Sequence, residues 1–368
     1  MSRVAANDGR RGLPLFKAAL WIRRNLFSNW LNGALTIAAL YFLYITVPPL
    51  LDWAVIDAAF RGVSGRDCPD KDAACWVFIR VRFSQFIYGS YPVAERWRVD
   101  LVFALAAIGV AGLLLPRVSC KKWIALGLMV LLPVAGWALL HGGWAGLKAV
   151  PTSEWGGLML TLVVAVWGIV TSIPLGLLLA LGRRSQMRLV RGVSIAFIEL
   201  WRGVPLIAVL FMAAVMFPLF VPAGTEFDTL LRALVALSLF NAAYMAEVFR
   251  GGLQAIPKGQ YEAAHALGLG YWRMMGLVIL PQAVRIVIPG IVNTCIAIFK
   301  ETTLVLVIGL FDLLGTVQAG LADPDWLIGD QVRITGYVFV AFVFWVFCFG
   351  MSRYSLRFGE RTRETPPA

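Results

Sequence analysis

The sequence predicts an all-α polytopic membrane protein, from its composition, its charge content and its apolar segments. Of its 368 residues, 60% are hydrophobic and only 15% are charged, and the mean hydropathy is +0.77. Soluble domains are roughly 45–50% apolar and about 25% charged, so a soluble fold could not cover this much apolar surface. Apolar segments recur that approach the 17–25 residues needed to cross about 30 Å of hydrocarbon. These properties exclude a soluble enzyme or nucleic-acid binder, although the net charge of +12 would otherwise suggest one.

Three predicted spans lie in residues 1–150. The first, Asn29–Leu51, follows Arg23 and Arg24 and has no small-residue cleavage site, so we expect a retained helix rather than a signal peptide. A long polar loop, 52–98, comes next. The spans Leu101–Leu115 and Trp123–Leu140 then flank a basic turn.

Five further spans are predicted in residues 151–357, giving about eight in total. They are Leu158–Leu181, Val204–Val221, Leu230–Val248, Ile286–Phe299 and Gly336–Phe349. The last two are short for a span. Thr302–Leu314 is apolar enough to lie at membrane depth but too short to count. Residues 358–368 form a predicted polar tail.

The distribution of Lys and Arg predicts the orientation. With the N-terminus inside, the inside segments carry twenty basic residues and the outside segments ten. Seven of those ten lie in the loop 52–98, beside six acidic residues, and long loops weigh less in the positive-inside rule. Both termini are therefore expected in the cytoplasm, with an even number of crossings.

Cysteine and histidine give little sign of chemistry. Cys68 and Cys75 share the predicted outside loop, where they could form a disulfide in an oxidising compartment or remain two free thiols. This spacing without a second pair is a poor zinc signature, and His141 and His265 are the only histidines. No phosphate-binding loop or nucleophile elbow is present. We therefore expect no metal site, no cofactor bound by this chain and no enzymatic activity.

The inside loop 254–281 holds a predicted short helix. Pro257 suits a helix start, and Gly268 suits the left-handed position that ends one. Glu262 lies near the positive end of this helix, and the alanines that follow keep it thin. Such a helix could dock in a groove of a partner protein, or it could rest on lipid headgroups.

The same loop carries the first part of a family resemblance. Glu262-Ala263-Ala264, Gly268 and Leu280-Pro281 have the spacing of the EAA loop of ABC-importer permeases, with Val278 where the family pattern has Ile. Four other motifs resemble the polar amino-acid permeases, the histidine/glutamine/general L-amino-acid branch, although Val204 replaces a common Thr. They are Gly157-Leu158 with Thr161-Leu162, Arg202-Gly203-Val204-Pro205-Leu206, Tyr244–Gly252 and Lys300-Glu301-Thr302-Thr303-Leu304. The three extra spans resemble the longer permease subunits of general L-amino-acid systems.

The resemblance implies an architecture and a set of partners. It implies a type I importer core of five helices in 151–357, preceded by three extra helices, in a bacterial inner membrane. The partners would be a second, paralogous permease subunit, two copies of a cytoplasmic ATPase that binds ATP and Mg, and a periplasmic amino-acid-binding protein. No nucleic acid is implied. The residues implied to couple transport to the ATPase are Glu262, Ala263, Ala264, Gly268 and Pro281.

Charged residues near the spans are candidates for binding an amino-acid substrate, because charges at membrane depth are costly and seldom lack a use. The candidates are the charged residues Arg202, Glu247, Lys300 and Glu301, together with the hydroxyls of Thr302 and Thr303 that follow them. Each has a structural alternative. Glu199 could pair with Arg202, Glu247 could pair with Arg250, and Lys300 and Glu301 could only mark the interface.

Two other function classes remain open. A secondary transporter or channel would need no ATPase, and the short Pro- and Gly-interrupted spans would suit it. A membrane enzyme or scaffold should show a cluster of His, Asp or Glu at membrane depth, and the sequence shows none.

Overall fold

The computed structural model describes residues 21–68, 72–115, 118, 120–222, 227–327 and 329–364. Every regular element in this part of the chain is a helix, and the strand-like pairings are three isolated bridges. The all-α prediction is confirmed. The chain divides into two compact units, Met1–Val77 and Phe78–Ala368.

The first unit is built around one long helix. Helix α2, Trp30–Leu51, continues as a π-helix over Asp52–Ile56. Asn29 caps its start, since the Asn29 side chain accepts a hydrogen bond from the Asn32 N–H at 2.8 Å. No residue of α2 is buried within the chain, as expected of a helix whose apolar side chains face lipid.

A short crosslinked loop follows α2 in the same unit. Cys68 and Cys75 form a disulfide with their Cα atoms 5.3 Å apart. Asp67 accepts hydrogen bonds from the backbone N–H groups of Val63 and Ser64, and these bonds lower the pKa of its carboxyl. Both constraints hold the loop in a compact turn.

The second unit contains the remaining helices. Its α-helices are α3 Trp76–Tyr88 (which begins just before the unit boundary), α4 Trp97–Leu114, α5 Lys121–Leu126, α6 Leu132–His141, α7 Gly157–Arg183, α8 Arg188–Gly203, α9 Leu206–Phe211, α10 Thr229–Ala255, α11 Lys258–Ala266, α12 Tyr271–Met274, α13 Leu280–Glu301, α14 Leu313–Leu321 and α15 Asp330–Glu364. Among the described residues, π-helical turns adjoin the longer helices at Asp52–Ile56, Gly127–Leu131, Met212–Met216 and Met275–Ile279. Short 3-10 helices include Phe217–Phe220 and Thr302–Ile308.

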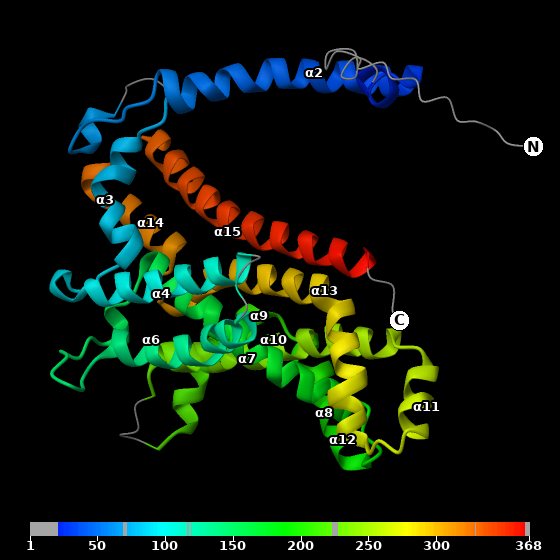
Figure 1. Ribbon diagram of the computed structural model, residues 1–368. Helices are drawn as coiled ribbons and strands as arrows, with labels where there is room; N and C mark the ends of the chain where they lie inside the picture. The colour runs from blue at the N-terminus through cyan, green and yellow to red at the C-terminus, as the bar shows by residue number, and fades with distance from the viewer. Residues whose placement is uncertain are drawn as a thin grey trace, which may run out of the picture. The chain divides into compact units, whose positions relative to one another are not determined.

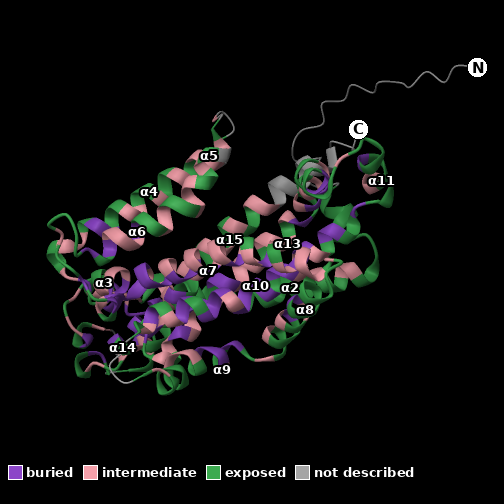
Figure 2. Ribbon diagram, turned by 90° about the horizontal axis from the view of Figure 1, so that it is seen from below, coloured by how far each residue is buried: buried purple, intermediate pink, exposed green. Residues whose placement is uncertain are grey.

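Helices α7 and α10 form the centre of this unit, and Figure 2 shows the buried residues concentrated along them. They run in the same direction, with Thr171 Oγ1 donating to Ser238 Oγ at 2.7 Å. Gly176 lets the backbones approach closely, because a Cβ there would lie 2.7 Å from the Met245 Cβ. Helix α13 then packs on α10, and α15 packs on α13 (Figure 1).

The predicted spans agree with the helices that the structure contains. Six helical segments among the described residues are long and apolar enough to cross a membrane, and a bent pair formed by α8 and Leu206–Phe220 makes a seventh. Each of the eight predicted apolar segments lies within or largely overlaps a helix of the structure, with α4 the one outside this set of seven. The helices extend beyond the predicted windows because backbone hydrogen bonding continues past the hydrocarbon. Thus Ile286–Phe299 widens to α13, and Gly336–Phe349 widens to α15.

Three regions differ from a simple reading of hydropathy. The loop 52–98 contains the helix α3, whose Phe78 and Phe86 are fully buried. The segment between the predicted spans Leu158–Leu181 and Val204–Val221 contains the amphipathic helix α8. Helix α15 continues to Glu364, into the predicted tail 358–368, of which 365–368 lie outside the described residues.

The crosslinked loop gives a first prediction. In intact cells or right-side-out vesicles, a membrane-impermeant maleimide should label Cys68 and Cys75 only after reduction, because a disulfide has no thiolate to react. Mass spectrometry of the peptide 52–98 measures the labelling. Exposed Cys120 serves as the control on the other side of the membrane. Labelling of Cys68 before reduction would contradict the disulfide, and labelling from the cytoplasmic side alone would contradict the orientation.

Candidate functional site

The short helix predicted between Pro257 and Gly268 is α11. Pro257 is its N-cap residue, and Gly268 has φ +72°, in the left-handed region as predicted. The Gly268 N–H donates to His265 O at 2.9 Å, and the Leu269 N–H donates to Ala264 O at 3.1 Å. These two bonds are the pair that closes a helix at a left-handed glycine. The prediction of a short helix ending at Gly268 is confirmed.

Helix α11 is attached to the helices behind it on one side and exposed on the other. Ala264 is 2% exposed and packs against the chain, whereas Glu262, Ala263 and His265 are exposed. Of the three residues in the EAA motif, two therefore face outward and Ala264 faces inward. Ala263 and Ala266 add only small side chains to this open side.

Two polar contacts fix α11 to different membrane helices. Arg184, at the end of α7, donates to the Tyr261 hydroxyl at 3.0 Å and to Leu253 O in α10 at 3.1 Å. Gln282 in α13 donates to the Gln260 side chain at 3.0 Å. A displacement of α11 must therefore act on α7, α10 and α13 together.

The chain between α11 and α13 is helical almost throughout. Helix α12 continues through the π-helix Met275–Ile279 into α13, where Pro281 occupies the first turn. Proline is tolerated in this position because its missing N–H is not needed there. A hollow of about 450 Å³ lies beside α11 and includes Lys258, Tyr261 and Glu262 in its lining.

Glu247 in α10 is the centre of an ion cluster at the same end of the bundle. Its Oε1 accepts from Arg183 Nη1 at 3.0 Å, and its Oε2 accepts from Arg250 Nε at 2.8 Å. Arg202 Nη1 lies 4.0 Å from Oε2. Glu199 completes the cluster through Arg183, at 3.1 Å. We call these five residues the Glu247 cluster; they join α7, α8 and α10.

The cluster decides between the pairings that the sequence left open. Glu247 pairs with Arg250, as the structural alternative predicted. Glu199 does not pair with Arg202; it pairs with Arg183, because α8 packs beside the end of α7. Arg202 lies instead over the ring of Tyr244, 5.8 Å from its centre. Arg202 is thus the most loosely held cation of the cluster.

The segment Lys300–Thr303 lies at the opposite end of α13. The Thr302 hydroxyl donates to Phe299 O at 2.8 Å, and the Thr303 hydroxyl donates to Lys300 O at 3.0 Å. Both hydroxyls therefore bond the last turn of the helix, and Lys300 is exposed. The Glu301 carboxyl faces Asn241 of α10, and its Oε2 is buried without a hydrogen-bond partner among the described residues.

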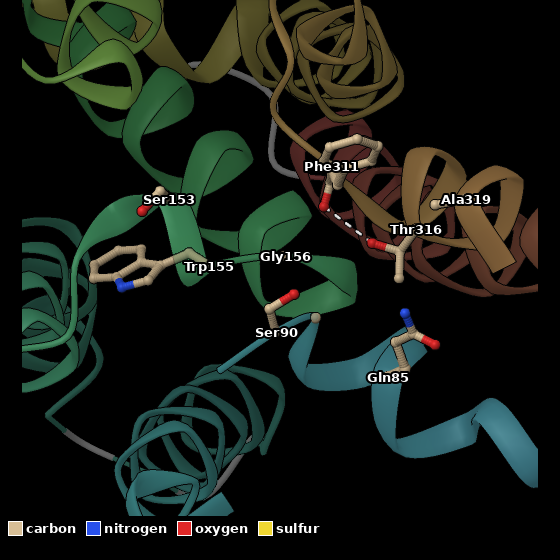
Figure 3. Close-up of a pocket in the computed structure, with 9 residues that line it drawn as sticks. Gln85, Ser90, Ser153, Trp155, Gly156, Phe311, Thr316 and Ala319 are labelled. Atoms are coloured by element: carbon tan, nitrogen blue, oxygen red, sulfur yellow. Dashed lines mark hydrogen bonds between the residues drawn. The ribbon is translucent and has the colours of Figure 1, made fainter. Parts of the chain in front are cut away.

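A polar junction at this end was not predicted as a site. Gly157 has φ +62°, and a Cβ there would lie 2.4 Å from Phe86 O, so only glycine fits. Its N–H donates to Phe311 O at 2.9 Å and to Thr316 Oγ1 at 3.0 Å. A cavity of about 170 Å³ lies beside this junction. Figure 3 shows the side chains that line it, with Gln85 and Ser90 facing the segments of Trp155 and Thr316.

Asp312 is buried in the same junction. It is 0% exposed, its Oδ1 accepts from the Gly315 N–H at 2.9 Å, and its Oδ2 has no partner in the described part of the chain. Asp312 lies outside the six long apolar helices, and burial raises the pKa of its carboxyl to about 6. An Asp directly before an apolar run is a helix-start signal, which could have identified this cap from the sequence. Its burial depends on contacts with distant segments.

No group of three His, Cys, Asp or Glu side chains that could hold a metal ion occurs in the ranges that the structure describes. The candidate residues therefore form two separate polar regions, one around α11 and Glu247 and one around Glu301 and Asp312.

The comparisons with known proteins find permeases of binding-protein-dependent transport systems. Residues 172–364 match the family described as binding-protein-dependent transport system inner membrane component. The chain is 51% identical over 352 residues to the inner membrane amino-acid ABC transporter permease protein YhdY of Escherichia coli K12, with 95% of each chain covered. It is 38% identical over 404 residues to the glutamate/glutamine/aspartate/asparagine transport system permease protein BztC of Rhodobacter capsulatus, with 92% of each covered. A solved amino acid ABC transporter chain, with histidines, is 30% identical over 56% of this chain and 92% of that chain, with a TM-score of 0.48.

Asp312 gives a prediction about pH. In the folded protein the pKa of the Asp312 carboxyl is about 6, above its ordinary value of 3.8. Ionising this carboxyl therefore costs more free energy in the folded protein than in the unfolded chain, so the charge weakens the fold. This carboxyl favours folding fully below pH 3.8, and the benefit is lost as the pH rises to about 6. Asp312→Asn keeps an acceptor for Gly315 and removes the charge. We expect it to raise the melting temperature at pH 8 by several degrees and to leave it unchanged near pH 4.

Thermal unfolding of the detergent-solubilised chain between pH 4 and pH 8 measures this difference. Asp330→Asn is the matched control, because that side chain is 81% exposed and should change little at either pH. A stabilisation by Asp312→Asn that is equal at both pH values would contradict the buried charge as its cause.

Proposed function

Because the chain belongs to the family of binding-protein-dependent transport system inner membrane components, we propose that it is an amino-acid permease driven through α11. Membership in this family makes it a multi-pass permease subunit of an ATP-driven importer. The names of both relatives include amino-acid transport, and we extend this substrate class to the present chain. A secondary transporter or channel, the alternative left open by the sequence, has no comparable support.

The attachment of α11 carries the proposal. An ATPase that closes on nucleotide can drive transport only if its motion reaches the spans without being absorbed by a flexible loop. Tyr261 and Gln260 join α11 to helices on two sides, and the buried Ala264 packs against the chain on the same face of α11. The exposed face with Glu262 and Ala263 is then the surface that an ATPase would hold.

The proposed assembly has the partners that such a permease requires. We propose a second permease subunit, two copies of a cytoplasmic ATPase and a periplasmic binding protein. ATP and Mg²⁺ would bind in the ATPase, so this chain would carry out no catalysis itself. We propose that α11 and both termini lie in the cytoplasm, which the excess of Lys and Arg in these segments supports.

The two polar regions would have different roles in transport. In the Glu247 cluster every carboxylate is paired with an arginine, which suits a structural connection between α7, α8 and α10. The Glu301 carboxyl has a buried oxygen without a partner, and it faces Asn241. An amino acid offers an ammonium group that could satisfy this oxygen. We therefore propose Glu301, rather than Glu247, as the substrate contact.

The coupling proposal predicts the effect of changes on α11. Gly268→Asp forces a side chain into a left-handed position, at a cost of about 1 kcal/mol or more, and adds a charge beside the exposed face. Helix α11 begins at Lys258, two residues earlier than predicted, so Glu262 lies in the middle of the helix, and Glu262→Lys reverses a charge on its exposed face. Both variants should insert normally, because neither residue lies in a span, and both should lose coupled ATP hydrolysis and uptake. Reconstituted complexes in liposomes measure these activities together.

Two variants serve as controls for this experiment. Gly270→Ala places a methyl group at φ −65° with no atom within 4 Å, so it should be neutral. Glu262→Gln keeps the shape and should retain more activity than Glu262→Lys. If Gly268→Asp and Glu262→Lys both transport at the wild-type rate, α11 is not the point of coupling.

The substrate proposal predicts the effect of Glu301→Gln. The change removes one charge with little change in shape, so uptake should fall at least tenfold, as expected when a charge-assisted bond worth 1.5–3 kcal/mol is lost. Basal ATP hydrolysis of the assembled complex should stay unchanged. Asp330→Asn, an exposed carboxylate near the same end, is the control. Unchanged uptake kinetics in Glu301→Gln would return this residue to a structural role.

A further inference from the structure

Helix α3 packs on the second unit at the end of the bundle opposite α11. It precedes residues 172–364, the part of the chain that matches the family. Phe78 and Phe86 are 0% exposed, and with Arg82 between them they follow one face of the helix at intervals of four residues. Phe83, on another side, is 51% exposed. Isolated helices shorter than about 12–15 residues are marginal in water, so the buried face is what holds this helix of 13 residues in place.

Phe78 fills a seat between α14 and α15. Its ring meets the ring of Trp326, in the turn between these helices, edge to face with the ring centres 5.2 Å apart. Gly320 in α14 and Gly336 in α15 leave room for Phe78, because Cβ atoms added at these positions would lie 3.3 and 3.4 Å from its ring. A larger side chain at either position would push the ring out of its seat.

The other end of α3 lies against the start of α7. A Cβ on Gly157 would lie 2.4 Å from Phe86 O, so the two backbones are in direct contact. Just after α3, Gly89 pairs with Trp155 in an isolated antiparallel bridge. The Phe86 ring also meets the ring of Phe339 in α15, with the centres 5.8 Å apart. Helix α3 therefore contacts α7, α14 and α15 at once.

An ion pair adds a polar contact beside the seat. Arg82 Nη2 pairs with Asp323 Oδ2, and Arg82 Nη1 donates to the Gln85 side chain at 2.8 Å. Asp323 lies in the turn after α14, where its Oδ1 accepts from the Asp325 N–H at 3.0 Å. Both charged side chains are partly exposed. This contact can therefore be replaced without opening the apolar seat.

We propose that α3 is a brace that joins the start of α7 to the turn between α14 and α15 and stays seated while the permease works. The seat consists of rings and glycine backbones in van der Waals contact, and close-packed contacts of this kind transmit a displacement rather than absorb it. The start of α7 and the α14–α15 turn then move as one body. This role rests on the proposed transport function, whereas the seating of α3 does not.

Thermal unfolding of the detergent-solubilised full-length chain tests the seat. Phe78→Ala should lower the melting temperature by about 5 °C or more, because it leaves a cavity in a buried contact. Gly320→Leu keeps Phe78 but extends a side chain into its seat, so it should lower the melting temperature as well. Phe83→Ala is the matched control on the same helix and should change little. Equal melting temperatures for Phe78→Ala and Phe83→Ala would contradict the seat.

A crosslink tests whether α3 stays seated during transport. The free cysteines of the described residues are first changed to Ser; they are Cys120, Cys295 and Cys348. The disulfide between Cys68 and Cys75 is kept, and a short bis-maleimide then links Arg82→Cys to Asp323→Cys. In the assembled complex in liposomes, we expect the link to leave the initial rate of amino-acid uptake unchanged from that of the unlinked variant. Loss of uptake on linking would mean that α3 leaves its seat, as a lid does, and would overturn the proposal.

A brace that acts through position also predicts a rescue by the same link. Phe78→Ala loosens α3, so the start of α7 and the α14–α15 turn can move separately. The number of ATP molecules hydrolysed per amino acid imported should therefore rise severalfold, and the link between positions 82 and 323 should restore the wild-type ratio. Phe83→Ala should leave this ratio unchanged. A wild-type ratio in unlinked Phe78→Ala, or a raised ratio that the link does not restore, would mean that α3 contributes stability alone.

The measurements separate failure of the brace from failure of the proposed function. If the wild-type complex shows no ATP-driven uptake, the proposed function is wrong, and the melting temperatures of the chain alone still decide whether α3 is seated. If the wild-type complex transports and the linked variant does not, transport stands and the brace is wrong.

Discussion

The packing of α7 on α10 is the contact on which the rest of the second unit depends. Inside a bilayer there is no hydrophobic force between helices, so close backbone approach must supply the attraction. Gly176 allows that approach, and the hydrogen bond between Thr171 and Ser238 fixes the register. With this register set, Arg183 and Arg184 at the end of α7 come to lie beside the last turns of α10.

At the α11 end of the bundle, side-chain contacts connect the packed helices to one another. Arg184 joins α7, α10 and α11 through side-chain and backbone acceptors, and Gln282 adds α13. The Glu247 cluster includes α8 in the same assembly. Most of these contacts involve an arginine, and charge-assisted hydrogen bonds are stronger than neutral ones. A force on α11 would therefore move several spans as one body.

The other end of the bundle relies on backbone bonds and buried carboxyls. Gly157, Phe311 and Thr316 connect the start of α7 to the start of α14, and a side chain at position 157 would collide with Phe86 O at the end of α3. Asp312 and Glu301 each leave a buried oxygen without a partner in the described part of the chain. Such groups cost free energy in the resting fold, which is consistent with a region that changes its contacts during transport.

The sequence by itself determined the membrane class, the approximate position of each span and the short helix that ends at Gly268. Each of these depends on composition or on signals within a few residues, so no distant contact is needed to predict it. Only the tertiary structure decided that Glu199 pairs with Arg183 rather than Arg202, and that Ala264 faces inward. It also decided that Asp312 is buried. These properties arise where segments far apart in the chain meet, and the spacing of residues along one segment carries no information about which surface the others will cover.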